Sequence, residues 1–131
     1  MLDHPTGADI LDSVSRLLRD TLMPALPADL VFQARVAANA IDLVAREIRL
    51  APGADQAAQA RLAALLSMAG GLDDLEAQLA SRIRNGEMGL QTPGLFAHLM
   101  ATALSKMAVD QPSYQSYRQE LEQASSSTPS D

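Results

Sequence analysis

Two charged side chains fall where the apolar pattern of their segments predicts uncharged ones. With about 100° between successive helical residues, Glu47 projects into the apolar arc of the segment 29–50. Lys106 projects into the apolar arc of a later segment, and Asp110 follows one turn beyond it on the same side. Burying an isolated charge is costly. We therefore expect Glu47 and Lys106 to lie close together, with Asp110 as a second acceptor.

These three charges have a functional and a structural interpretation. A buried ionic group of this kind can bind a ligand or transfer protons. It can also be a structural ion pair, or its side chains can extend to the surface, because Glu47 and Lys106 both stand in the last turns of their predicted helices. The sequence favours the structural interpretation.

A polar stripe runs along the same segment as Glu47, at spacings of four, three, four and three residues. Its members are Arg35, Asn39, Asp42, Arg46 and Arg49. Guanidinium groups bind phosphates and carboxylates bidentately, so the stripe is a candidate surface for an acidic partner or a phosphate ligand. The alternative is a solvated helix face with weak local ion pairs.

His98 is the remaining titratable side chain with possible chemistry, and Thr102 and Lys106 follow it at four-residue spacing. A histidine can shuttle protons or bind a metal. We expect no metal, because His4 is the only other histidine and belongs to a flexible end. His98 is therefore expected at the surface or at the boundary of the core. No glycine-rich phosphate loop and no Gly-x-Ser-x-Gly motif is present, so no cofactor and no catalytic residue is expected.

The elements that must position these residues are helices, because apolar residues recur at i, i+3, i+4 and i+7 and no strand-like alternation occurs. The first predicted helix is capped by Thr6, has Asp9 in its first turn, and runs to Leu22. The second spans 29–50 and ends where Pro52-Gly53 breaks the chain.

Three further helices and a short last one follow. A third helix is predicted over 55–69, ended by Gly70-Gly71, and a fourth opens with a capping box of Asp73 and Glu76. The fifth starts at Thr92-Pro93 and ends near residue 110, and a short helix contains residues 114–121. We predict an all-α bundle of about five amphipathic helices plus a short C-terminal helix, with one domain over 1–123 and a disordered serine-rich tail over 124–131.

Composition limits the classes of function. The 131 residues are 47% hydrophobic and 20% charged, which is typical of one globular domain. A net charge of −6 with a single lysine provides no basic face for nucleic acid. The sequence has no cysteine, no secretory signal pattern and no apolar run long enough for a membrane span, so we expect a cytoplasmic protein that binds no membrane.

Three segments carry a resemblance to a known family. They are Pro5-Thr6 leading into Leu11, Val14 and Leu18; Phe32-x-x-Arg35-Val36-Ala37-Ala38-Asn39-Ala40 running to Arg46-Glu47; and Arg82-Ile83-Arg84-x-Gly86-Glu87 with Leu99, Lys106, Val109-Asp110 and Pro112-x-Tyr114. In these the chain resembles a bacterial family of small uncharacterised helical proteins, classed as a domain of unknown function. The resemblance implies that members are encoded near acyl-CoA dehydrogenases and aminoglycoside-phosphotransferase-like kinases. It assigns no catalytic residue.

Function is predicted in broad terms only. The leading hypothesis is a non-enzymatic helical interaction or accessory protein, linked to acyl-CoA metabolism by the resemblance. Its partner would be kinase-like, acyl-CoA-dehydrogenase-like or a second copy of the chain. The alternative is a small-molecule-binding bundle that uses Glu47, Lys106 and Asp110 inside an apolar cleft, and a third hypothesis is an enzyme that uses the same charges.

Overall fold

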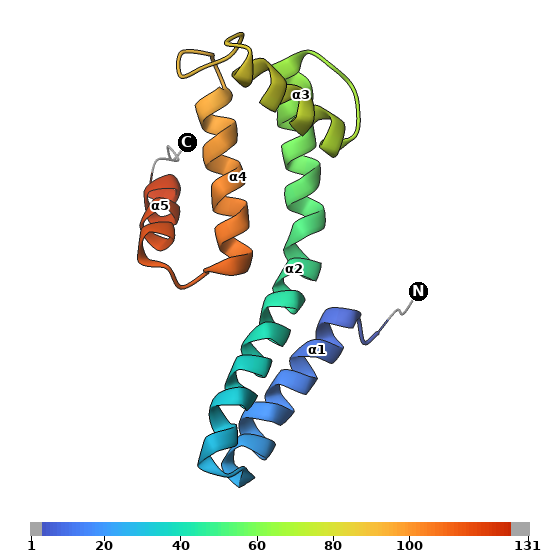
Figure 1. The fold of residues 1–131 in the computed structure, drawn as a ribbon, viewed down its shortest axis with the longest axis vertical. Helices are drawn as coiled ribbons and strands as arrows, with labels where there is room; N and C mark the ends of the chain where they lie inside the picture. The colour runs from blue at the N-terminus through green and yellow to red at the C-terminus, as the bar shows by residue number, and fades with distance from the viewer. Residues whose placement is uncertain (1–3, 127–131) are drawn as a thin grey trace. The chain divides into compact units, whose positions relative to one another are not determined.

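The computed structural model describes residues 4–126, and in that part of the chain every regular element is helical (Figure 1). The prediction of an all-α protein is confirmed. The α-helices are α1 (Gly7–Arg16), α2 (Ala28–Leu66), α3 (Leu72–Arg84), α4 (Leu95–Asp110) and α5 (Gln115–Ser126). A π-helical turn, η1 (Leu17–Leu22), and a 3-10 turn, η2 (Met23–Ala25), join α1 to the segment before α2.

The chain groups into two compact units, residues 1–50 and 51–131. The first unit holds α1, η1, η2 and the first part of α2. The second holds the rest of α2 together with α3, α4 and α5. The single domain expected over 1–123 stays a prediction. The tail expected from residue 124 is helical as far as Ser126, and residues 127–131 lie outside the described part.

The main correction to the predicted elements concerns Pro52. The two helices expected over 29–50 and 55–69 form one helix, α2, which contains this proline in its interior. Proline removes one backbone donor and crowds the preceding turn, but it does not prevent a helix where the flanking residues favour one. Here five alanines between Ala51 and Ala60, the best helix formers, surround it. Local propensity therefore outweighs the break that Pro52-Gly53 predicted.

The helix ends match the predictions only in part. Thr6 caps α1 as expected, because its hydroxyl accepts from the Asp9 N–H at 3.2 Å while the Asp9 carboxylate accepts from the Thr6 N–H at 3.0 Å. The capping box expected at Asp73 is wrong, because the residue before α3 is Gly71 and no side chain caps that helix. The stop of α2 comes earlier than predicted, at Ser67, whose φ of 51° is left-handed.

The start of α4 also differs from the prediction. Thr92-Pro93 belongs to a turn, in which the Thr92 hydroxyl accepts from the Gly89 N–H at 2.9 Å. The helix begins three residues after Thr92, at Leu95, directly after Gly94. Gly94 has a φ of 85°, which side chains with a Cβ rarely adopt, so glycine fits this junction.

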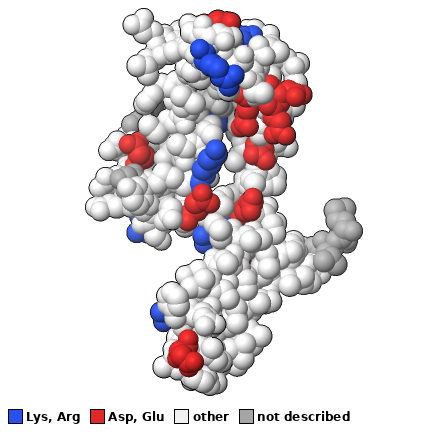
Figure 2. All heavy atoms as spheres, viewed as in Figure 1, with Lys and Arg blue, Asp and Glu red and all other residues white. Residues whose placement is uncertain are grey.

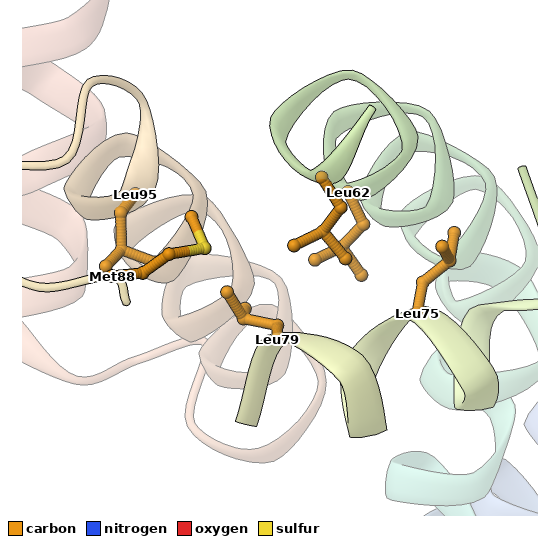
Figure 3. Packing of buried hydrophobic residues seen from close by; sticks show 6 residues of the cluster. Leu62, Leu75, Leu79, Met88 and Leu95 are labelled. Carbon is orange, nitrogen blue, oxygen red and sulfur yellow. The ribbon is translucent and has the colours of Figure 1, made fainter. Parts of the chain in front are cut away.

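The second unit has a hydrophobic core built from three helices. The buried residues of this cluster are Leu62 and Leu66 from α2, Leu75 and Leu79 from α3, Met88 from the connection, and Leu95 from α4. Figure 3 shows these side chains directed toward one another between the helices. Burial of such leucines contributes roughly 1.5–3 kcal/mol each. This core fixes the position of α4 against α2 and α3.

Candidate functional site

The first unit is held together by a seam of small residues. Ala8 and Ser15 on α1 and Ala38 and Ala45 on α2 are buried, and each pair is separated by seven residues, or two helical turns. Small side chains let the two helices approach closely. In the described residues 4–50, no apolar side chain larger than alanine is buried. The seam therefore removes little apolar surface from water.

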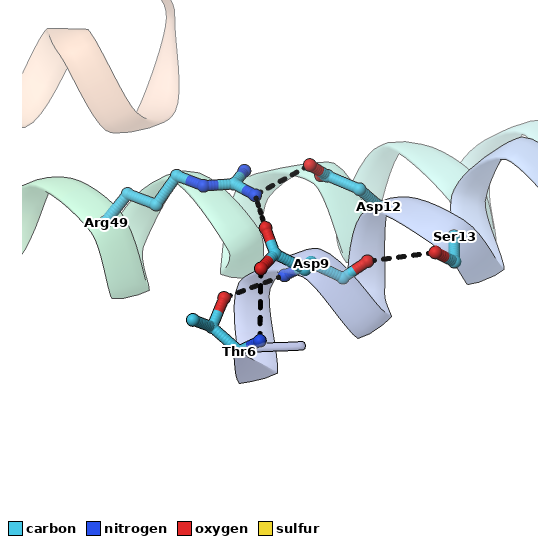
Figure 4. A network of polar contacts seen from close by, with 5 residues as sticks. All are labelled: Thr6, Asp9, Asp12, Ser13 and Arg49. Carbon is cyan, nitrogen blue, oxygen red and sulfur yellow. Dashed lines mark hydrogen bonds and ion pairs between the residues drawn. The ribbon is translucent and has the colours of Figure 1, made fainter. Parts of the chain in front are cut away.

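Polar contacts join the same two helices along one edge of the seam. The Arg49 guanidinium on α2 donates to the Asp12 carboxylate at 2.7 Å and to the Asp9 carboxylate at 3.2 Å (Figure 4). The backbone and side-chain hydrogen bonds from Thr6, followed by the contact with Arg49, lower the pKa of Asp9 below its ordinary value. The capping box of α1 is thus tied directly to α2. Since these side chains are solvent-exposed, the ion pairs themselves are weak.

A second polar contact involves the π-helical turn. Arg19 donates to the Asp42 carboxylate at 2.7 Å and to the Asn39 side-chain oxygen at 2.8 Å. Burial raises the pKa of Asp42, but hydrogen bonds from Ser15 and Arg19 and the charges of Arg19 and Arg46 outweigh it, so that this pKa lies below its ordinary value. These groups stabilise the connection of η1 to α2.

Three residues of the predicted polar stripe have a structural role. Asn39 and Asp42 accept hydrogen bonds from Arg19, and Arg49 donates to Asp9 and Asp12. Arg35 is exposed, and Arg46 lies near enough to Asp42 to act on its charge. Binding of an acidic partner or a phosphate by Arg35, Asn39 and Arg46 stays a prediction.

The three charges expected in an internal site are all exposed. Glu47 belongs to the first unit, and Lys106 and Asp110 belong to the second. The apolar arcs that contain these side chains lie on the surface, so no buried ionic group forms from them in the described residues. The approach of Glu47 to Lys106 stays a prediction.

The exposed apolar residues on α2 form a defined surface, which we call the α2 arc. Its members are Phe32, Val36, Val44 and Ile48, with exposures of 68%, 50%, 43% and 48%. At about 100° per residue they fall within a sector of roughly 160°, with Glu47 between Val36 and Val44. Figure 2 shows that uncharged residues form most of the face of this unit in that view.

A similar exposed surface lies on α4, which we call the α4 face. Phe96 and Leu99 are 65% and 47% exposed, Ala103 is exposed, and Lys106 lies on the same side of the helix. Asp110 follows Lys106 by one turn on the same side and is also exposed, so this face carries one positive and one negative charge beside its apolar side chains. The charge of Glu47 within the α2 arc is opposite to that of Lys106.

The second unit contains a polar group that the sequence did not reveal. His98 on α4 is only 5% exposed, so the expectation of a surface or boundary histidine is wrong. The Nε–H of Arg61 on α2 donates to His98 Nδ1 at 3.2 Å. Burial and then the charge of Arg61 lower the pKa of His98, against the opposing charge of Glu76. The imidazole is therefore neutral at pH 7, and its proton is on Nε2 because Nδ1 is an acceptor.

Two polar atoms near this contact are buried without partners. The Arg61 Nη2 and the Thr102 hydroxyl have no hydrogen-bond partner among the described residues. Thr102 follows His98 by one turn of α4. A cavity of about 420 Å³ adjoins the contact, lined by Arg61, Ala64, Leu65, Pro93, Gly94, Ala97 and His98. Sequence spacing shows His98 and Thr102 on one side of a helix, but it gives no sign that Arg61, 37 residues earlier, meets them.

Other classes of site find no support in the described residues. These contain no group of three or more His, Cys, Asp or Glu side chains that could hold a metal ion. None of the helices between residues 4 and 126 is long and apolar enough to cross a membrane.

Comparison with known proteins gives a family but no activity. Residues 24–114 match the family model described as a domain of unknown function, DUF6285. The matched segment includes α2, α3 and α4, and therefore also the α2 arc, the α4 face and the Arg61–His98 contact. No curated protein and no solved structure matches the chain.

Proposed function

Because the chain belongs to the DUF6285 family, a domain of unknown function, its role has to be inferred from its own surfaces. We propose that it is a non-enzymatic helical interaction protein that pairs with a second copy of itself. In the pair, the α2 arc of one copy docks on the α4 face of the other. One observation carries the proposal: in the described part of the first unit no apolar side chain larger than alanine is fully buried, and the α2 arc is exposed.

The α2 arc is expected to be covered by a partner, because apolar surface exposed to water is unfavourable. A unit reaches stability by burying apolar area, at roughly 25 cal/mol per Å². The first unit spans residues 1–50, and units this small bury a low fraction of their surface and are marginally stable. The first unit buries only alanines and one serine in its seam. Contiguous exposed apolar patches on soluble proteins mark interaction sites. The α2 arc fits that description better than it fits a solvated helix face.

The charges within the two surfaces argue for a second copy as the occupant. Glu47 in the α2 arc would be left unpaired under an uncharged apolar partner, which is unfavourable. The α4 face offers Lys106 beside exposed Phe96 and Leu99 as the partner of Glu47, with Asp110 one turn further along the helix. In a twofold pair, each copy contributes both surfaces, so the contact between Glu47 and Lys106 occurs twice. This assigns the two charges to an interface.

The test is the oligomeric state of charge variants, measured by sedimentation velocity across a range of protein concentrations. Wild-type protein is expected to form a dimer, and Glu47→Lys and Lys106→Glu are each expected to dissociate it. The double variant Glu47→Lys/Lys106→Glu restores opposite charges and is expected to restore the dimer. The controls Glu120→Lys and Arg118→Glu make the same charge changes on exposed positions of α5 and are expected to stay dimeric.

A finer part of the proposal concerns the cellular setting. We propose that the pair acts in the bacterial cytoplasm as an accessory to acyl-CoA metabolism, on the basis of the gene neighbourhood implied by the family resemblance. The partner would be an acyl-CoA-dehydrogenase-like or kinase-like protein encoded beside it. Mixing the purified chain with each neighbouring enzyme and measuring co-elution tests this part. Separate elution from every one of them would remove the accessory role and leave the self-pairing intact.

A further inference from the structure

The Arg61–His98 contact and its adjoining cavity have no part in the proposed pairing. We propose that this cavity is a binding site for a small anion, a carboxylate or phosphate group carried on a short apolar body. The site lies wholly within the second unit, between α2 and the beginning of α4.

The first reason is the state of Arg61. Arg61 is partly buried, and its Nη2 is shielded from water. A buried polar atom without a hydrogen-bond partner is unfavourable. Arg61 takes no part in the ion pairs that Arg19 and Arg49 form. Its Nε–H faces a neutral imidazole, and its buried Nη2 has no acceptor among the described residues. An anion in the cavity would supply the missing acceptor.

The second reason is the chemistry of the walls. No carboxylate lines the cavity, and the lining other than Arg61 and His98 is apolar or glycine. The first turn of α4 borders it, and the first N–H groups of a helix carry partial positive charge and lack acceptors within the helix. A positive group, a helix N-terminus and apolar walls together favour a ligand with a negative head and an apolar body.

The third reason is size. A cavity of about 420 Å³ falls within the range of roughly 300–1,000 Å³ that small-molecule sites occupy. Ala64, Leu65 and Ala97 line the cavity beside Arg61. His98 holds the Arg61 guanidinium in place through its Nδ1. We therefore assign Arg61 as the anion-binding residue and His98 as the residue that positions it.

The test is titration of ¹⁵N-labelled wild-type protein with inorganic phosphate, acetate, butyrate and butyl phosphate, followed by NMR. Binding is expected to shift the His98 ring signals and the amide signals of Phe96 and Ala97. The butyl compounds are expected to bind more tightly than phosphate or acetate. Comparison of butyrate with butyl phosphate distinguishes a carboxylate ligand from a phosphate ligand, because the favoured head group gives the lower Kd.

Two variants and a matched control make the test specific. Arg61→Met is expected to weaken binding by about tenfold or more, since charge-assisted bonds are lost. Ala97→Leu fills the cavity while keeping Arg61, so it provides a second test if Arg61→Met fails to fold. Arg84→Met removes an exposed positive charge from α3 and is expected to bind as wild type does. The proposal would be overturned by unchanged His98 signals at about 10 mM of every probe, or by equal loss of binding in Arg84→Met.

Discussion

Pro52 allows a direct test of whether α2 is one continuous helix, because the sequence predicted a break there and the structure has none. Proline inside a helix is about 3 kcal/mol less favourable than alanine, since it lacks the N–H that would donate to the carbonyl of Ile48. Against this, replacing proline gives the unfolded chain more freedom, which costs about 0.4–1 kcal/mol. The substitution Pro52→Ala is therefore expected to raise the free energy of unfolding by about 2 kcal/mol.

The assay is urea unfolding followed by circular dichroism, at one protein concentration because the proposed dimerisation would make stability depend on concentration. The transition midpoint is expected to move to higher urea with little change in the m-value. Pro27→Ala is the matched control, because Pro27 precedes the first residue of α2 and removes no bond from the helix interior. If Pro52→Ala is no more stabilising than Pro27→Ala, α2 is broken at Pro52 in solution, as the sequence spacing predicted.

Two further substitutions and a change of pH are expected to alter the stability of the fold. Leu62→Ala is expected to lower the free energy of unfolding by about 3–5 kcal/mol in urea titration, because Leu62 is fully buried in the core of the second unit. Gly94→Ala is expected to lower the melting temperature, because φ is 85° there and residues with a Cβ rarely adopt that conformation. His98 has a pKa lowered from 6.5, so between its folded and unfolded pKa values the unfolded chain binds more protons. Stability is therefore expected to fall as pH drops below about 6.5, and His98→Asn is expected to remove this dependence.

Local sequence rules predict that the chain is helical. The predicted ends of individual helices are wrong where opposing local preferences compete or where contacts outside the helix set the end. Apolar spacing is sufficient for α3, and Thr6 with Asp9 is sufficient for the cap of α1. Spacing alone cannot weigh the alanines beside Pro52 against the proline itself. It also cannot show that Gly94, and not Thr92, precedes the first residue of α4, because that depends on the turn in which Thr92 accepts from Gly89.

For the candidate sites too, the sequence predicts some features and only the structure shows the others. A helical wheel correctly places Glu47 and Lys106 within apolar arcs, but it does not tell whether an arc is covered, and both are exposed. The hydrogen bond that His98 accepts comes from Arg61, which lies on a different helix. No rule of spacing within one segment can predict that contact. A site whose residues come from two helices therefore has to be identified from the structure.

The mass of the wild-type protein in solution tests the proposed pairing most directly. Light scattering coupled to size-exclusion chromatography is expected to give twice the 13.9 kDa mass of one chain. The dimer is expected to be lost in Glu47→Lys and regained in Glu47→Lys/Lys106→Glu. A mass of one chain at every concentration, or a dimer unaffected by either single charge reversal, would contradict the docking of the α2 arc on the α4 face of a second copy.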